Sequence, residues 1–246
     1  MSSVSDTARH VVLVHGAWHG GWCFSALQAE LDRRGIPSYA IDLPGHGASV
    51  EKLGDLSTDA KAVQAFLQVL ADRGISESVL VGHSYGGAVI SQAAAHGPSV
   101  SSLIYLAAFA LESGESVMSA LGSFPQHHVA LGSAIQMRND GSSVLDPTIA
   151  KAALYGSCDD IAADAALSRL TPQPMATMAQ ALSNSALGSV PSTYVICSHD
   201  EAVHPVHQAL MAQRCSQTIT LETDHSPFLS MIEETASIIE QHARHQ

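Results

Sequence analysis

Positively charged side chains are scarce in this sequence. Lysine and arginine together number 11 against 23 aspartate and glutamate residues, so the formal net charge is -12 at pH 7. A protein with this balance repels a phosphate backbone, and we find no cluster of lysine and arginine along the chain that would offset the repulsion locally. We therefore expect no nucleic acid partner.

Long apolar runs are also missing. No segment reaches the roughly 18 uninterrupted apolar residues that a bilayer span needs, although 46% of the chain is hydrophobic. The N-terminal stretch MSSVSDTARH is polar and lacks the charged, apolar and small-residue order of a secretory signal. We therefore expect no membrane association and a cytoplasmic location.

Cysteine is limited to four scattered positions, Cys23, Cys158, Cys197 and Cys215. Their spacing does not follow the CxxC pattern of metal sites, and the closely spaced pairs His15/His19 and His204/His207 have no evident third ligand. We interpret the cysteines as small, reduced, buried hydrophobic side chains. We expect no metal site and no cofactor.

The 246 residues are enough for one well-filled core, in which β-branched apolar runs alternate with amphipathic stretches. The predicted strands are His10 to Val14, Ser38 to Ile41, Ser78 to Val81, Ser101 to Ala107, Thr193 to Cys197 and Thr218 to Leu221. The predicted helices are Trp22 to Arg34, Thr58 to Arg73, Tyr85 to His96, Pro205 to Arg214 and Pro227 to Arg244. This alternation predicts an α/β fold with a mostly parallel sheet covered by helices on both faces, whose ligands bind at the carboxyl ends of the strands.

The alternation stops between residues 111 and 188. This stretch shows no convincing strand, but it contains alanine-rich helical segments and turns. We therefore predict a helical cap at 111–188, inserted into a core made of residues 1–110 and 189–246. A pair of long irregular loops is the less favoured alternative, because unstructured loops of that length are uncommon.

A nucleophile motif follows the third predicted strand. Gly82-His83-Ser84-Tyr85-Gly86-Gly87 lies between that strand and a helical pattern, which is the setting that a G-x-S-x-G elbow requires. The tight turn exposes the serine hydroxyl above the sheet, and its crowded backbone needs small residues on either side. We predict that Ser84 is a nucleophile.

A serine nucleophile needs an imidazole to take its proton and a carboxylate to orient that imidazole. Asp200 and His225 each follow one of the last two predicted strands, in the order that this fold requires. Glu201, Asp224 and Glu112 are the competing carboxylates, and His199, His204 and His83 are the competing bases. We predict Ser84, His225 and Asp200 as the catalytic triad.

A tetrahedral intermediate also needs backbone N–H donors for its oxyanion. One is predicted at Tyr85, directly after the nucleophile, and the other at Ala17 in the glycine-rich loop His15-Gly16-Ala17-Trp18-His19-Gly20-Gly21-Trp22. A plain glycine-rich turn is the alternative interpretation of that loop. The segment from Asp42 to Gly47 is predicted to be a structural turn without chemistry.

Several sequence segments together resemble one branch of the α/β-hydrolase superfamily, which includes plant methylesterases, hydroxynitrile lyases and bacterial carboxylesterases. They are the loop from Val14 to Trp22, the elbow, Ala108-Phe109, Leu154-Tyr155-Gly156-Ser157-Cys158 and Asp224-His225-Ser226-Pro227-Phe228. The likeness runs from about residue 10 to the C-terminus. It implies an α/β-hydrolase fold with an inserted cap.

Two positions separate the esterases of this branch from the lyases. The lyases carry threonine directly after the loop histidine and lysine directly after the catalytic histidine, where this chain has Gly16 and Ser226. Without that cation there is no evident way to stabilise departing cyanide. Tyr85 stands where many relatives have leucine, which places a larger ring beside the oxyanion site.

The sequence therefore predicts a serine carboxylesterase that hydrolyses small carboxylic esters through an acyl-enzyme. A lyase or other non-hydrolytic enzyme on the same triad and a small-ligand receptor with a residual triad are the alternatives. A homodimer is left open as an alternative to a monomer. The substrate-binding candidates are Gly16, Trp18, His19, Phe109, Phe124, Leu154, Tyr155 and Ser226, with His127, His128, Met137, Met175 and Met178 as further cap residues.

Overall fold

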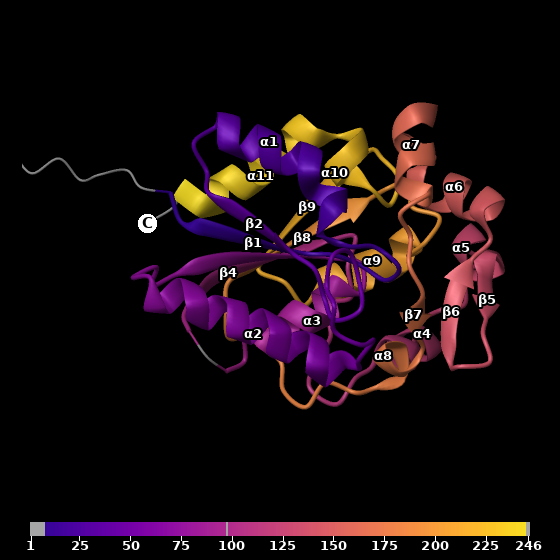
Figure 1. Cartoon of the computed structure of the whole chain (residues 1–246), viewed down its shortest axis with the longest axis horizontal. Coiled ribbons are helices and arrows are strands. Elements are labelled where there is room, and N and C mark those ends of the chain that lie inside the picture. Colours follow the sequence, from indigo (N-terminus) through magenta and orange to yellow (C-terminus); the bar gives the residue numbers. More distant parts are fainter. Residues whose placement is uncertain (1–7, 97, 245–246) are drawn as a thin grey trace, which may run out of the picture.

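The computed structural model describes residues 8–96 and 98–244 (Figure 1). Most of the polar N-terminal stretch considered above therefore lies outside the described residues. Within the described residues, no helix is both long and apolar enough to cross a membrane.

A six-stranded parallel sheet forms the centre of the molecule, with the strand order β2-β1-β3-β4-β8-β9. Its strands are β1 (His10–Val14), β2 (Ser38–Ile41), β3 (Ser78–His83), β4 (Val100–Leu106), β8 (Ser192–Cys197) and β9 (Gln217–Leu221). All six predicted strands are confirmed to within about two residues at each end. The chain turns in opposite directions after β1 and β3, so a ligand crevice is expected where these two strands end.

Helices cover both faces of the sheet (Figure 1). On one face lie α1 (Ser25–Arg33), which follows the short 3-10 helix Gly21–Phe24, and the pair α10 (Pro227–Ser230) and α11 (Ile232–Arg244). On the other lie α2 (Leu56–Asp72), α3 (Gly86–Ala93) and α9 (Pro205–Ala212). The single helix predicted from Pro227 to Arg244 is wrong, because Met231 adopts φ -138 and ψ 60 and separates two helices.

The continuous apolar strands are explained by burial on both faces. Alternate side chains of a strand point to opposite faces, and Val11 and Leu13 of β1 pack in the core cluster that contains Leu27 of α1. Val12 and Val14 pack in the cluster on the opposite face. A strand with only one buried face would instead alternate between apolar and polar residues.

The cap contains a small sheet that the sequence did not predict. Its helices are α4 (Val117–Ser123), α5 (Ala130–Ala134), α6 (Pro147–Tyr155), α7 (Asp160–Leu167) and α8 (Ala176–Ala179). Beside them β5 (Ile135–Met137), β6 (Ser142–Leu145) and β7 (Gln173–Pro174) form an antiparallel sheet. The expectation of a stretch without strands is therefore wrong. These strands are too short to show a period, and β7 pairs with a strand that lies about 30 residues earlier.

Candidate active site

The elbow places Ser84 between β3 and α3 in a conformation that few residues adopt. Its φ is 52, in the left-handed region that a side chain disfavours. The backbone of Ser84 is held by hydrogen bonds from Ser84 N–H to Leu106 O at 3.2 Å and from Phe109 N–H to Ser84 O at 3.0 Å. A Cβ on Gly82 would lie 2.6 Å from the carbonyl oxygen of Gly86, so the predicted need for glycine here has a direct steric cause.

Asp200 and His225 are in contact at the carboxyl ends of β8 and β9. His225 Nδ1 lies 2.7 Å from Asp200 Oδ2, and both residues are buried. Because the carboxylate accepts this hydrogen bond, the proton of a neutral His225 ring is on Nδ1. Nε2 is then the nitrogen that can accept a proton.

The competing carboxylates have other partners. Asp224 Oδ2 accepts a hydrogen bond from Ser157 N–H of the cap at 2.9 Å, and its Oδ1 accepts one from Ser226 N–H at 3.1 Å. Glu201 and Glu112 are exposed. Asp200 is therefore the carboxylate that the structure places on the His225 ring.

Gln208 of α9 is a buried part of this site that sequence reasoning missed. Its Nε2 donates to Asp200 Oδ2 at 2.8 Å, while Asp200 Oδ1 accepts from Ala202 N–H and Val203 N–H at 2.7 and 2.8 Å. The carboxylate is thus surrounded by donors, which hold it in the orientation that faces His225. No local motif marks Gln208. Asp200 lies before α9 begins at Pro205, so helical spacing does not link it to Gln208 in the sequence.

Three further histidines surround the elbow, and burial keeps them neutral. Burial lowers the pKa of His15 to about 3 and that of His19 to about 4, and it lowers the pKa of His83 well below its usual value. Their hydrogen bonds fit neutral rings: His19 Nδ1 donates to Ala17 O at 2.8 Å, and its Nε2 accepts from the Tyr155 hydroxyl at 2.7 Å. His83 Nε2 donates to the carbonyl oxygen of His225 at 2.9 Å.

The two predicted oxyanion donors lie in the loops that follow two neighbouring strands, β1 and β3. Val14 at the end of β1 is in register with Gly82 at the end of β3, which brings the loop from His15 to His19 beside the elbow. Trp18 in this loop has φ 62 although it is not glycine. Tyr85 precedes α3, and the first N–H groups of a helix have no partner within the helix.

The side chain of Tyr85 points to α2. Its hydroxyl donates a 2.6 Å hydrogen bond to Asp59 Oδ2. Burial raises the pKa of Asp59 to about 7, although the bond from Tyr85 acts in the opposite direction. The larger ring expected beside the oxyanion site is therefore present, but its phenol is engaged by a buried acid.

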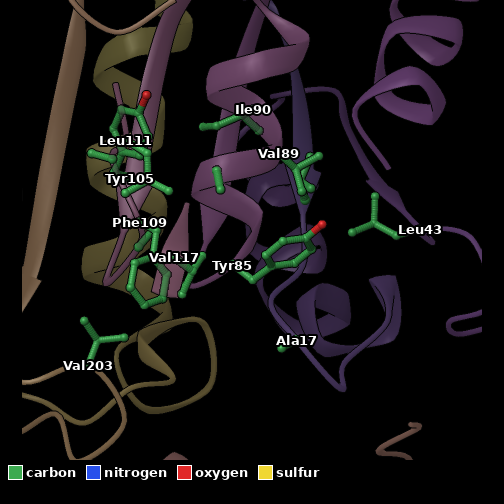
Figure 2. Packing of buried hydrophobic residues seen from close by; sticks show 14 of the residues in the cluster. Ala17, Leu43, Tyr85, Val89, Ile90, Tyr105, Phe109, Leu111, Val117 and Val203 are labelled. Atoms are coloured by element: carbon green, nitrogen blue, oxygen red, sulfur yellow. The ribbon is translucent and has the colours of Figure 1, made fainter. Parts of the chain in front are cut away.

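An apolar cavity of about 190 Å³ opens in front of Ser84 between the core and the cap. Its lining comprises Ala17, Trp18, Ser84, Tyr85, Phe109, Val117, Met118, Leu121, Val129, Leu131, Gly132, Ile135, Met175, Met178, Ala202 and Val203. In Figure 2, Phe109 and Val117 lie next to each other, and Ala17 lies below the ring of Tyr85. None of these lining residues carries a charge, so the cavity suits an uncharged apolar group.

Comparison with known proteins identifies the family of this chain. The family model described as the alpha/beta hydrolase family matches residues 11–238. The chain belongs to the alpha/beta hydrolase family. Within it, the chain is 30% identical to the alpha/beta hydrolase nvfD of Aspergillus novofumigatus, over 89% of this chain and 90% of that protein. It is 29% identical to Methylesterase 2 of Arabidopsis thaliana over 89% and 90%, respectively.

A solved structure has a fold similar to that of this alpha/beta hydrolase. A pyrethroid hydrolase from Sphingobium faniae superposes with a TM-score of 0.83 at 25% sequence identity, covering 96% of this chain and 97% of that one. The fold predicted from the sequence and the resemblance to the methylesterase branch are confirmed.

The structure separates the predicted substrate-binding residues of this alpha/beta hydrolase into two groups. Trp18 and Phe109 line the cavity, as do the cap residues Met175 and Met178. The lining does not include Gly16, His19, Phe124, Leu154, Tyr155 or Ser226, nor the further cap candidates His127, His128 and Met137. Tyr155 instead supports His19, and the ring of Phe124 packs on His207 and under the guanidinium of Arg214. Motif position alone therefore did not reveal which side chains line the cavity.

The cysteines and histidines give no sign of a metal centre. All four cysteines are unpaired; Cys23 and Cys197 are buried, but Cys158 and Cys215 are only partly so. Within residues 8–96 and 98–244, no group of three or more His, Cys, Asp or Glu side chains is arranged to hold a metal ion.

Proposed function

We propose that this protein is a serine carboxylesterase that hydrolyses small, uncharged carboxylic esters. Ser84 is the nucleophile, His225 the general base and Asp200 the group that orients His225. The backbone N–H groups of Ala17 and Tyr85 stabilise the oxyanion. The observation that carries the proposal is the 2.7 Å contact between Asp200 and His225 at the same edge of the sheet as the strained Ser84, which opens onto an apolar cavity.

The proposed reaction has two halves. His225 Nε2 takes the Ser84 proton as Oγ attacks the ester carbonyl, and the tetrahedral intermediate collapses when His225 returns that proton to the departing alcohol. Water, deprotonated by the same nitrogen, then attacks the acyl-enzyme and releases the acid. Asp200 stabilises the imidazolium that forms in each half.

The names of the relatives support ester hydrolysis. Methylesterase 2 of Arabidopsis thaliana is similar over 89% of this chain, and a carbendazim hydrolyzing esterase from Nocardioides is 39% identical over 45% of this chain and 46% of that protein. The pyrethroid hydrolase of similar fold acts, by its name, on pyrethroids. Hydrolysis is thus the chemistry that these names share, and two of them specify an esterase.

The geometry at Gly16 weighs against the lyase alternative. A Cβ on Gly16 would lie 2.8 Å from Ser84 Cβ and 2.9 Å from His83 Nδ1, so the present backbone has no room for a threonine. Ser226 is buried and supplies no cation. The receptor alternative does not account for a buried carboxylate held on His225, since a binding pocket needs no base.

Turnover of p-nitrophenyl acetate, butyrate and octanoate tests the proposal. We expect the wild-type protein to hydrolyse the two shorter esters best, because the cavity is small and enclosed by the cap. Ser84→Ala should reduce kcat by a factor on the order of 10⁴ or more, because the covalent route is lost.

Ser168→Ala is the matched control, since this exposed serine ends α7 away from the cavity, and its activity should equal that of the wild type. Thermal unfolding of both variants checks that the fold is retained. Ester turnover that survives in a folded Ser84→Ala protein would refute the assignment of the nucleophile.

A further inference from the structure

The cap reaches the predicted oxyanion loop through one buried amide. Gln173 of β7 is 1% exposed. Its Oε1 accepts a hydrogen bond from Trp18 N–H at 3.1 Å and lies 3.0 Å from His46 Nε2, while its Nε2 donates to Thr177 Oγ1 at 2.8 Å. Burial of a side-chain amide is unfavourable unless its polar atoms are bonded. The amide of Gln173 is therefore held in one orientation by partners on both its atoms.

Trp18 needs such support, because its backbone is in the left-handed region. A residue other than glycine keeps this conformation only where its surroundings hold it. The cap binds both sides of the residue: Gln173 accepts from Trp18 N–H, and Thr171 N–H donates to Trp18 O at 2.8 Å. The Trp18 indole also donates to Ser143 Oγ of β6 at 3.2 Å.

The Trp18 nitrogen and the Ala17 carbonyl belong to one peptide plane. Gln173 therefore holds one of the two peptide planes that meet at the Cα of Ala17, and His19 Nδ1, which donates to the Ala17 carbonyl at 2.8 Å, holds the other end of that plane. The N–H of Ala17, the proposed oxyanion donor, lies in the second plane, whose Gly16 carbonyl oxygen hydrogen-bonds with His15 Nδ1 at 2.8 Å. The cap thus restrains the peptide that follows Ala17, while the loop itself restrains the peptide that precedes it.

The second arm of the amide leads to Thr177. The Thr177 hydroxyl receives the hydrogen bond from Gln173 Nε2 and donates to the carbonyl oxygen of Pro174 at 2.6 Å. Thr177 therefore holds the Gln173 amide on one side, while the amide holds Trp18 on the other.

We propose that Gln173 is a positioning residue for the oxyanion hole, through which the cap restrains the loop that carries the Ala17 donor. This inference rests on the proposed esterase function. It explains why the position holds a glutamine, since the site requires an acceptor for Trp18 and a donor for Thr177 on one side chain. Glutamate keeps the acceptor oxygen but loses the donor, and methionine keeps the approximate length but has neither.

The test compares Gln173→Met and Gln173→Glu with the wild type on p-nitrophenyl butyrate. For Gln173→Met we expect kcat to fall about 10- to 100-fold with KM changed by no more than about twofold, because a misplaced donor weakens the transition state rather than substrate binding. The kcat of Gln173→Glu should lie between those of the wild type and Gln173→Met, because glutamate keeps the acceptor for Trp18 N–H. Gln136→Met, at an exposed glutamine on β5, is the matched control and should behave as the wild type.

Two ligands distinguish a positioning role of Gln173 from a role in fold stability alone. A short-chain alkyl trifluoromethyl ketone forms an adduct in which Ser84 Oγ bonds to the carbonyl carbon, the π pair moves to oxygen and the hydroxyl proton passes to His225. The corresponding trifluoromethyl carbinol fills the cavity without forming an oxyanion. Gln173→Met should weaken ketone binding by about the same factor as kcat and leave carbinol binding unchanged.

An unchanged kcat, or an equal loss of affinity for ketone and carbinol, would overturn the inference. If Gln173→Met does not fold, Thr177→Val is measured with the same ligand pair. It removes the hydroxyl that orients the amide, and a selective loss of ketone affinity is again expected. Ser84→Ala separates failure of the esterase proposal from failure of the Gln173 proposal. Activity that persists in Ser84→Ala refutes the esterase proposal. If Ser84→Ala is inactive and Gln173→Met is fully active, only the role of Gln173 is refuted.

Discussion

At the scale of single residues, the carboxylate in the site depends on a neighbour that no motif marks. Asp200 accepts four hydrogen bonds, of which one reaches His225 and one comes from the Gln208 amide. Gln208 Oε1 also accepts from Cys197 N–H at 2.9 Å, at the end of β8. Gln208 therefore links the strand end, the carboxylate and α9.

Replacing Gln208 with leucine should lower both activity and stability. Loss of the Nε2 donor leaves His225 as the one remaining partner of Asp200 Oδ2 among the described residues, and we expect kcat on short esters to fall on the order of tenfold, equivalent to about 1.4 kcal/mol. The amide of Cys197 loses its partner at the same time, which should cost about 1–3 kcal/mol of unfolding free energy.

Steady-state kinetics and urea unfolding measure the two effects. Gln213→Leu, at an exposed glutamine that follows the same helix, is the control. A stability loss without any change in kcat would mean that Gln208 serves the fold alone.

The positions of Ser84, Asp200 and His225 could be predicted from the sequence because each follows an apolar strand whose end is easily recognised. Asp200, Glu201 and Asp224 could only be ranked as candidates for the acid, since all three lie near the same edge of the sheet. The contact between Asp200 and His225 is what distinguishes them. Gln208 and Gln173 were missed. An isolated glutamine has no pattern, and its role arises from partners that are distant in the chain.

At the scale of elements, a buried acid joins α2 to the start of α3. Asp59 of α2 accepts the hydrogen bond from Tyr85, and burial raises its pKa to about 7 from the ordinary value of 3.8. The fold therefore favours the protonated acid. As pH rises from 3.8 to 7 the unfolded chain releases this proton first, so the contribution of Asp59 to stability falls across that window.

Asp59→Asn should remove this pH dependence. The amide oxygen still accepts from Tyr85 but carries no charge, so the variant should gain stability relative to the wild type as pH rises from about 4 to about 7. The gain has an upper limit on the order of 4 kcal/mol, because each pKa unit corresponds to about 1.4 kcal/mol.

Urea unfolding across this pH range provides the measurement, and Asp72→Asn, at an exposed carboxylate of the same helix, is the control. A constant difference between Asp59→Asn and the wild type at every pH would contradict the buried-acid interpretation.

The strands and helices of the core could be predicted where they were long enough to show a hydrophobic period. The six strands are buried on both faces and contrast clearly with their flanking helices. The cap strands were not predictable, because β5 and β7 have three and two residues and their pairing is set by tertiary contacts. The break between α10 and α11 at Met231 was also missed, because the apolar pattern of the sequence continues through it.

At the scale of the whole molecule, two features act against anionic substrates. The net charge of -12 repels them at long range, and a cavity lined by uncharged residues offers no partner for a buried carboxylate. The first effect is screened by salt and the second is not.

Methyl benzoate and the monomethyl ester of terephthalic acid test this difference, because they differ by one carboxylate. We expect kcat/KM for the charged ester to be lower by about 100-fold or more, since an unpaired charge is costly to bury. At about 1 M salt, where the screening length falls to about 3 Å, most of the discrimination should remain. Its disappearance in salt would show that the overall charge, and not the cavity, excludes anions.

The crowding around Gly16 also limits how this protein can change. A side chain at that position would meet Ser84 Cβ, which the chemistry retains, and His83 Nδ1, whose ring is anchored to the carbonyl oxygen of His225. Only a shift of the loop can make room, and the loop is tied to the cap through Trp18. A route toward chemistry that needs a hydroxyl at position 16 therefore requires coordinated substitutions in the loop, at position 83 and in the cap strands. Single mutational steps along that route would be unfavourable, which makes position 16 a point of strong epistasis.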